Sequence, residues 1–251
     1  MTNDYWDNSV ELNKLAELSI KTGVALQPGQ DLIITSPLEA APLVRRLAFH
    51  AYKQGCGIVT PLYTDPKVTL LRYENAQKNS FDKATDWLFE GIGAAFDNNT
   101  ARLAIVGEDP MLLSGQDPED IGRANQAVSK ASSPVRERIT RFDINWNIIA
   151  WPGTQWAKRV FPNMAAADAQ KELATAIFKA SRVDGHDPGG AWRAHNANLR
   201  KRTDWLNSKG FAALHFYGEG TDLTVGLADG HEWMGGASVA RNGVTCNPNI
   251  P

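Results

Sequence analysis

Four short apolar runs alternate with amphipathic helical stretches over the first 150 residues of this chain. The runs cover residues 31–35, 57–63, 102–107 and 146–151. Runs of this length that are rich in β-branched residues are typical of strands buried on both faces of a parallel sheet. A strand, a helix and a second strand within about 35 residues form a βαβ unit, in which the two strands are parallel. The order therefore predicts an α/β fold: an open, mainly parallel sheet with flanking helices.

The helices between these runs are expected from the spacing of apolar residues. In the stretch 10–21, for example, Leu12, Leu15 and Ala16 recur at intervals of three and four, as on one face of a helix. Similar stripes predict helices over 38–54 and 81–96, and one that begins near Pro118. If this assignment is correct, Ile33, Val59, Ile105 and Ile149 lie in one common sheet.

Beyond residue 152 the pattern changes. Helices are predicted over 155–160, 168–181 and 188–207, followed by strands over 211–217 and 222–227 and around 232–234. Because the stretch 184–190 is rich in helix-breaking residues, we predict two domains, an N-terminal α/β domain over 1–185 and a second unit over 186–251. We expect the second unit to be truncated, since its β-rich segment ends without the partner strands that would cover its edges.

Composition excludes several classes of protein. The 26 Lys and Arg residues are balanced by 28 Asp and Glu residues, so a net charge of −2 offers no general attraction to nucleic acid. No apolar run reaches the roughly 18 residues of a membrane span, and the amino terminus lacks the pattern of a signal peptide. The two cysteines, Cys56 and Cys246, are far apart in the sequence. We therefore expect a cytoplasmic protein without membrane or nucleic-acid partners.

No common catalytic or metal-binding motif is complete. Gly91-x-Gly93 lies inside a helical pattern rather than at a strand-to-helix turn, which argues against a dinucleotide fingerprint. His231-Glu232 lacks the second histidine of a zincin helix. The five histidines are scattered, and His195 on an apolar stripe is expected to be a hydrogen-bonded core or boundary residue. The residues alone indicate an α/β protein without a complete active site.

The order of several short motifs resembles the aminopeptidase T family, also called the thermophilic metalloproteases. Nearly the whole chain takes part in the resemblance. Its elements are Gln27-Pro28-Gly29-Gln30 before a strand, Ala51-Tyr52-x-x-Gly55, Ala150-Trp151-Pro152, Phe161-Pro162, Gly220-Thr221-Asp222-Leu223, Trp233-x-Gly235-Gly236 and Asn247-Pro248-Asn249-Ile250-Pro251. No single element is specific, but the ordered set is.

The resemblance implies a cytosolic metallo-exopeptidase that removes amino-terminal residues from peptides and forms homodimers. Such enzymes use a pair of divalent cations, with zinc, cobalt or magnesium suited to their glutamate, histidine and aspartate ligands. In the family a Thr-Glu-Glu sequence that supplies the first ligand follows the Asn-x-Pro segment, and this chain ends before it. We therefore predict no catalytic and no metal-binding residue within residues 1–251, and expect this chain alone to be inactive.

Three residues are substrate-cavity candidates by resemblance: Thr221, Asp222 and Trp233. Several motifs of the family resemblance lie close together in this part of the sequence. They precede the position at which the family has its first metal ligand. Two other interpretations stay open. One is a non-catalytic dimerisation or binding module with an α/β fold; the other is a nucleotide-binding domain, which the missing phosphate loop disfavours.

Overall fold

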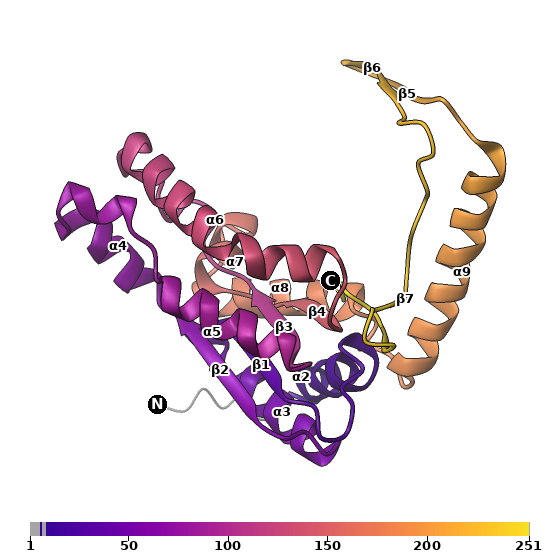
Figure 1. Ribbon diagram of the computed structural model, residues 1–251, viewed down its shortest axis with the longest axis horizontal. Helices are drawn as coiled ribbons and strands as arrows, with labels where there is room; N and C mark the ends of the chain where they lie inside the picture. Colours follow the sequence, from indigo (N-terminus) through magenta and orange to yellow (C-terminus); the bar gives the residue numbers. More distant parts are fainter. Residues whose placement is uncertain (1–5, 7–8, 251) are drawn as a thin grey trace.

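The computed structural model describes residue 6 and residues 9–250, and its centre is a four-stranded parallel sheet (Figure 1). The strands are β1 (Leu32–Pro37), β2 (Val59–Thr64), β3 (Ala101–Val106) and β4 (Trp146–Ala150), in the order β2-β1-β3-β4. The sheet contains Ile33, Val59, Ile105 and Ile149, which confirms the predicted fold class. Within the described residues, no helix is both long and apolar enough to cross a membrane.

Side chains of β1 alternate between two cores. Leu32 and Ile34 belong to a large cluster on one face of the sheet, and Ile33 belongs to a second cluster on the other face. This alternation follows from the two-residue period of a strand. Because both faces are covered, residues 32–34 of the strand are all apolar, as the sequence predicted.

Helices cover both faces of the sheet. They are α2 (Val10–Leu18), α3 (Ala41–Lys53), α4 (Pro66–Asn75), α5 (Asp86–Asp97), α6 (Pro118–Thr140), α7 (Thr154–Val160), α8 (Ala166–Ala180) and α9 (Pro188–Lys209), with the short helical turns Ser19–Gly23, Leu38–Ala40 and Lys78–Asp82. Residues of α2, α3 and α8 pack into the first cluster, and residues of α5 and α6 pack into the second. The result is a three-layer α/β/α arrangement.

Two strand connections leave on opposite faces of the sheet. From β1 the chain passes through α3 on one face to β2, whereas from β3 it passes through α6 on the other face to β4. Since β1 and β3 are neighbours, the loops that follow them separate at the carboxyl edge and leave a crevice there.

Helix α9 and a hairpin form an arm that leaves the sheet (Figure 1). The two strands predicted over 211–217 and 222–227 are present as β5 (Ala213–Gly218) and β6 (Thr221–Gly226), which pair antiparallel, but the hairpin has no buried residue on either face. Trp192 alone is buried in α9. The strand predicted around 232–234 is absent, because Asn207 of α9 both donates to and accepts from the Trp233 backbone.

The last described segment returns from the arm to the sheet. It contains the short pair β7 (Ser238–Val239) and β8 (Thr245–Cys246), and then runs beside β4. The Ile148 amide donates to Pro248 O at 2.7 Å, and the Ile250 amide donates to Ile148 O at 3.0 Å. Residues 238–250 therefore pack on the sheet, apart from the arm, although both lie in the predicted second domain. The boundary near residue 185 stays a prediction.

Candidate functional site

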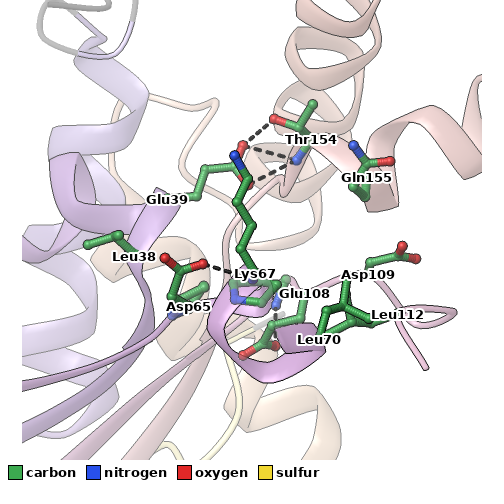
Figure 2. A pocket seen from close by; sticks show the side chains of 13 residues that line it. Leu38, Glu39, Asp65, Lys67, Leu70, Glu108, Asp109, Leu112, Thr154 and Gln155 are labelled. Atoms are coloured by element: carbon green, nitrogen blue, oxygen red, sulfur yellow. Dashed lines mark hydrogen bonds between the residues drawn. The ribbon is translucent and has the colours of Figure 1, made fainter. Parts of the chain in front are cut away.

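The crevice between the β1 and β3 loops opens into a cavity of about 580 Å³, which we call the crevice cavity (Figure 2). Every strand of the sheet contributes the residues that follow its carboxyl end. These are residues 37–39 after β1, 65–67 and 70 after β2, 107–109 and 112 after β3, and 154–155 after β4. In open α/β sheets this is the edge where ligands bind, at the point where the winding of the chain reverses. The crevice cavity is therefore the candidate functional site within the described residues.

Two glycines allow the loops after β3 and β4 to meet at this edge. Gly107 has φ +153°, and a Cβ atom there would overlap the carbonyl oxygen of Trp151. A Cβ atom at Gly153 would in turn overlap the carbonyl oxygen of Gly107. Larger residues would force the two loops apart, so the shape of this edge depends on both glycines.

Glu39 fixes one wall of the crevice cavity. Its carboxylate accepts hydrogen bonds from the Thr154 backbone N–H at 3.1 Å and from the Thr154 hydroxyl. It also accepts one from Gln170 Nε2 at 2.9 Å. Glu39 thus ties the turn after β1 to the start of α7 and to α8, and its carboxylate occupies the end of α7 where an anion would otherwise be attracted.

Asp109 is held by a second set of contacts. Its two carboxylate oxygens accept from Arg159 at 2.6 and 3.2 Å, and one of them also accepts from the Met111 amide at 3.0 Å. Hydrogen bonding from the Arg159 guanidinium lowers the pKa of the Asp109 carboxyl below its usual range, and the Met111 amide adds to this. The pair connects the loop after β3 to α7.

Lys67 and Glu108 differ from these residues because their charged groups make no hydrogen bond or ion pair with another side chain of the described residues. Lys67 makes no side-chain hydrogen bond and no ion pair with any described residue, and its side chain is exposed. The partner of the Glu108 carboxylate among the described residues is the Gly107 amide, at 3.3 Å. Figure 2 shows the Lys67 side chain extending from α4 in the direction of Glu39 and Thr154, with the Glu108 carboxylate near the opposite end of the view.

The three predicted cavity residues lie away from the crevice cavity. Thr221 and Asp222 are on β6 of the arm, where Asp222 Oδ1 is 2.7 Å from His215 Nε2. Trp233 lies beside α9, with its ring edge-on to His231 and its Nε1 buried without a partner among the described residues. The structure brings Thr221 and Asp222 together on the hairpin but does not bring Trp233 to them. Their role at a substrate cavity stays a prediction.

The donor atoms of the described residues do not fit a pair of metal ions. No group of three or more His, Cys, Asp or Glu side chains converges in residue 6 or residues 9–250. The nearest approach to a ligand set on the arm, His215 with Asp222, is an exposed pair. A two-metal centre needs several converging oxygen and nitrogen ligands, so no reaction step is derived through a metal on these residues.

The histidines have ordinary structural partners. His195 Nδ1 accepts a hydrogen bond from Arg182 Nη2 at 3.1 Å, and the ring lies edge-on to Trp192, which agrees with the boundary role predicted for it. Desolvation by burial, and then the positive charge of Arg182, lower the pKa of His195. His50 contacts Asn13 Oδ1 at 2.9 Å, and burial lowers its pKa as well.

The sequence interpretation missed Glu39, Lys67 and Glu108. A signal for them was present, since each follows one of the apolar runs predicted as strands. Parallel strands carry their carboxyl ends to one edge, so polar residues directly after such runs are expected to gather there. Strand order was the missing information, because it decides which two loops flank the crevice.

The known proteins that are similar to this chain are metalloproteases and aminopeptidases. The sequence pattern of the thermophilic metalloproteases (M29) matches residues 8–251. Aminopeptidase T of Thermus aquaticus is 48% identical over 240 residues, and aminopeptidase T of Thermus thermophilus is 46% identical over 240 residues. Aminopeptidase 2 of Geobacillus stearothermophilus is 38% identical over 241 residues.

A solved structure supports the same relationship. The wild-type AmpT structure from Thermus thermophilus superposes with a TM-score of 0.90 at 44% sequence identity, covering 96% of this chain and 59% of that one. The matches to the two Thermus enzymes likewise cover 96% of this chain, which spans 59% of their length. On the agreement of sequence pattern, identity and fold, this chain belongs to the thermophilic metalloprotease (M29) family.

Proposed function

We propose that this chain is the amino-terminal portion of a metal-dependent aminopeptidase that releases amino-terminal residues from peptides. The observation that carries the proposal is the family match over residues 8–251, together with relatives named as aminopeptidases at up to 48% identity. Because the chain spans 59% of the length of those relatives, the activity is proposed for the longer protein.

The metal pair, whether zinc, cobalt or magnesium, is proposed to be held by residues in the part of the family that this chain does not span. The support for a metal is the match to the metalloprotease family pattern over residues 8–251. In this proposal the α/β sheet is a platform, and the arm formed by α9 and the hairpin contacts the catalytic portion. The longer protein is proposed to work on peptides as a homodimer in the cytoplasm.

The test compares residues 1–251 with the product of the complete reading frame on leucine 4-nitroanilide, with zinc, cobalt or magnesium added. We expect the longer product to hydrolyse the substrate and a chelator to abolish its activity. Residues 1–251 alone are expected to be inert. Chelator-sensitive turnover by residues 1–251, or an inert longer product with each of the three metals, would contradict the proposal.

A further inference from the structure

The crevice cavity has apolar walls and a strongly charged rim. Leu38 lines it from the helical turn after β1, Leu70 from α4 and Leu112 from the loop after β3. Four carboxylates also line it, from Glu39, Asp65, Glu108 and Asp109, against the single ammonium group of Lys67. Apolar walls with a few placed polar groups are typical of sites for small molecules.

The charged side chains of the cavity differ in how many hydrogen-bond partners they have. Glu39 is saturated by Thr154 and Gln170, and Asp109 is paired with Arg159. Asp65 caps α4 with one oxygen, which accepts from the Lys67 amide at 2.9 Å. The Lys67 ammonium has no hydrogen bond or ion pair within the described residues, and the Glu108 carboxylate accepts only from the neighbouring Gly107 amide, at 3.3 Å. These two charged groups are therefore the least engaged among those that line the cavity.

The signs of the charges in the cavity indicate which charges a ligand should carry. A purely anionic ligand, such as a nucleotide, would meet four carboxylates and would find the start of α7 already taken by Glu39. A purely cationic ligand would leave the Lys67 ammonium unpaired and repelled. A ligand that carries both an ammonium and a carboxylate group can pair with Glu108 and Lys67 together.

The spacing of the strands limits the length of such a ligand. Lys67 follows β2 and Glu108 follows β3, with β1 between them in the sheet. Neighbouring strands are about 4.8 Å apart, so the loops after β2 and β3 are separated by about 10 Å. An extended dipeptide spans roughly 7 Å, and with a charged hydrogen bond of about 2.8 Å at each end it joins charged groups about 12–13 Å apart. The Lys67 side chain extends away from the Glu108 carboxylate (Figure 2), which allows the two charged groups to be farther apart than the loops, whereas a free amino acid is too short to join them.

We propose that the crevice cavity binds an apolar dipeptide in its zwitterionic form. The dipeptide ammonium group pairs with the Glu108 carboxylate, its carboxylate group pairs with the Lys67 ammonium, and its side chains lie against Leu38, Leu70 and Leu112. This goes beyond the proposed peptidase activity, because the site is built from the sheet of this chain and binding requires no metal.

The binding experiment uses residues 1–251 with a chelator present, so that hydrolysis plays no part. Leucyl-leucine is titrated and followed by calorimetry and by amide chemical shifts. Three analogues accompany it: leucyl-leucinamide without the carboxylate, N-acetyl-leucyl-leucine without the ammonium, and free leucine. We expect leucyl-leucine to bind most tightly and to shift amides of the loops after β2 and β3. Its affinity should fall as salt is raised, because both charged groups are exposed.

Two variants test which side chain of the cavity binds each charged group of the dipeptide. Lys67→Gln should weaken leucyl-leucine by about tenfold, the range expected for one charged hydrogen bond, yet leave leucyl-leucinamide unchanged. Glu108→Gln should weaken leucyl-leucine by a similar factor and leave N-acetyl-leucyl-leucine unchanged. The matched controls are Lys130→Gln on α6 and Glu172→Gln on α8, which make the same substitutions at exposed side chains outside the cavity. Both controls should bind leucyl-leucine as tightly as the parent chain does.

The outcomes are decisive for this proposal and separate from the peptidase assay. No binding of leucyl-leucine, or equal binding by the parent chain and both cavity variants, would overturn the site. Binding of leucyl-leucinamide as tight as that of leucyl-leucine would show a site for cations instead of zwitterions, and would overturn it too. None of these results bears on whether the longer protein hydrolyses peptides.

Discussion

Gly107 and Gly153 are the residues on which the carboxyl edge of the sheet most directly depends. We expect Gly153→Ala to lower the free energy of unfolding by about 2 kcal/mol, because the added methyl group would overlap the carbonyl oxygen of Gly107. Urea denaturation measures this change. The matched control is Gly91→Ala in α5, where nothing lies within 4 Å of the new Cβ atom. This control should raise stability slightly, because alanine favours a helix. Equal stability of the two variants would show that the loops do not meet as described.

The Asp109–Arg159 pair makes a pH-dependent contribution to stability. A carboxyl whose pKa is lowered on folding adds stability that is fully present above its unfolded-state pKa and is lost as the pH falls through its folded-state pKa. The pKa of Asp109 lies below its ordinary value of 3.8. Asp109→Asn should therefore cost about 1 kcal/mol at neutral pH, and the difference from the parent chain should shrink as the pH falls below about 4.

Unfolding curves of the parent chain and Asp109→Asn at a series of pH values check this expectation. The control is Asp184→Asn, because the Asp184 side chain is exposed and makes no ion pair with any described residue. It should leave the pH dependence of stability unchanged. A cost of Asp109→Asn that is the same at pH 7 and at pH 3 would mean that the charge of the pair contributes nothing.

At the scale of elements, the hairpin of β5 and β6 contrasts with the sheet. Leu223 of β6 is 52% exposed, whereas Leu103 of β3 is fully buried. We expect Leu223→Ala to change the free energy of unfolding of residues 1–251 by less than about 0.5 kcal/mol, and Leu103→Ala to lower it by about 2–5 kcal/mol. Urea denaturation of both variants tests this. A large loss from Leu223→Ala would show that the hairpin packs on the body of the chain.

Apolar patterns predicted most of the strands and helices, but not which of them are buried. The four strands of the sheet were found because each contains a short apolar run, although the edge strand β2 has no buried residue. Helix α4 was missed because none of its residues is buried, so it carries no apolar stripe. The apolar stripe expected on α9 does not lie in a core. Residues 233–236 pack against part of it, and Trp192 is the one buried residue of the helix. The sequence predicted β5 and β6 as strands, but not the exposure of both of their faces.

At the scale of the whole molecule, the family could be recognised from ordered motifs, while the crevice cavity could not. The cavity is assembled from residues that are 118 positions apart at its extremes, Pro37 and Gln155, and their meeting depends on strand order. The terminal Asn247-Pro248-Asn249-Ile250 segment was recognised as a motif, but its pairing with β4 required the structure. The buried Asn147 side chain, which donates to Asn247 O at 2.7 Å, shows how closely the two are joined.

The central proposal is that the longer protein holds a catalytic metal pair and that the residues holding it lie outside residues 1–251. The most direct test is metal content, measured by mass spectrometry after both residues 1–251 and the product of the complete reading frame are dialysed with zinc and then against metal-free buffer. We predict that the longer product retains a metal pair and that residues 1–251 retain none. Asp222→Asn in residues 1–251 controls for weak capture by the exposed His215–Asp222 pair. Retention of a stoichiometric metal pair by residues 1–251 would contradict the account.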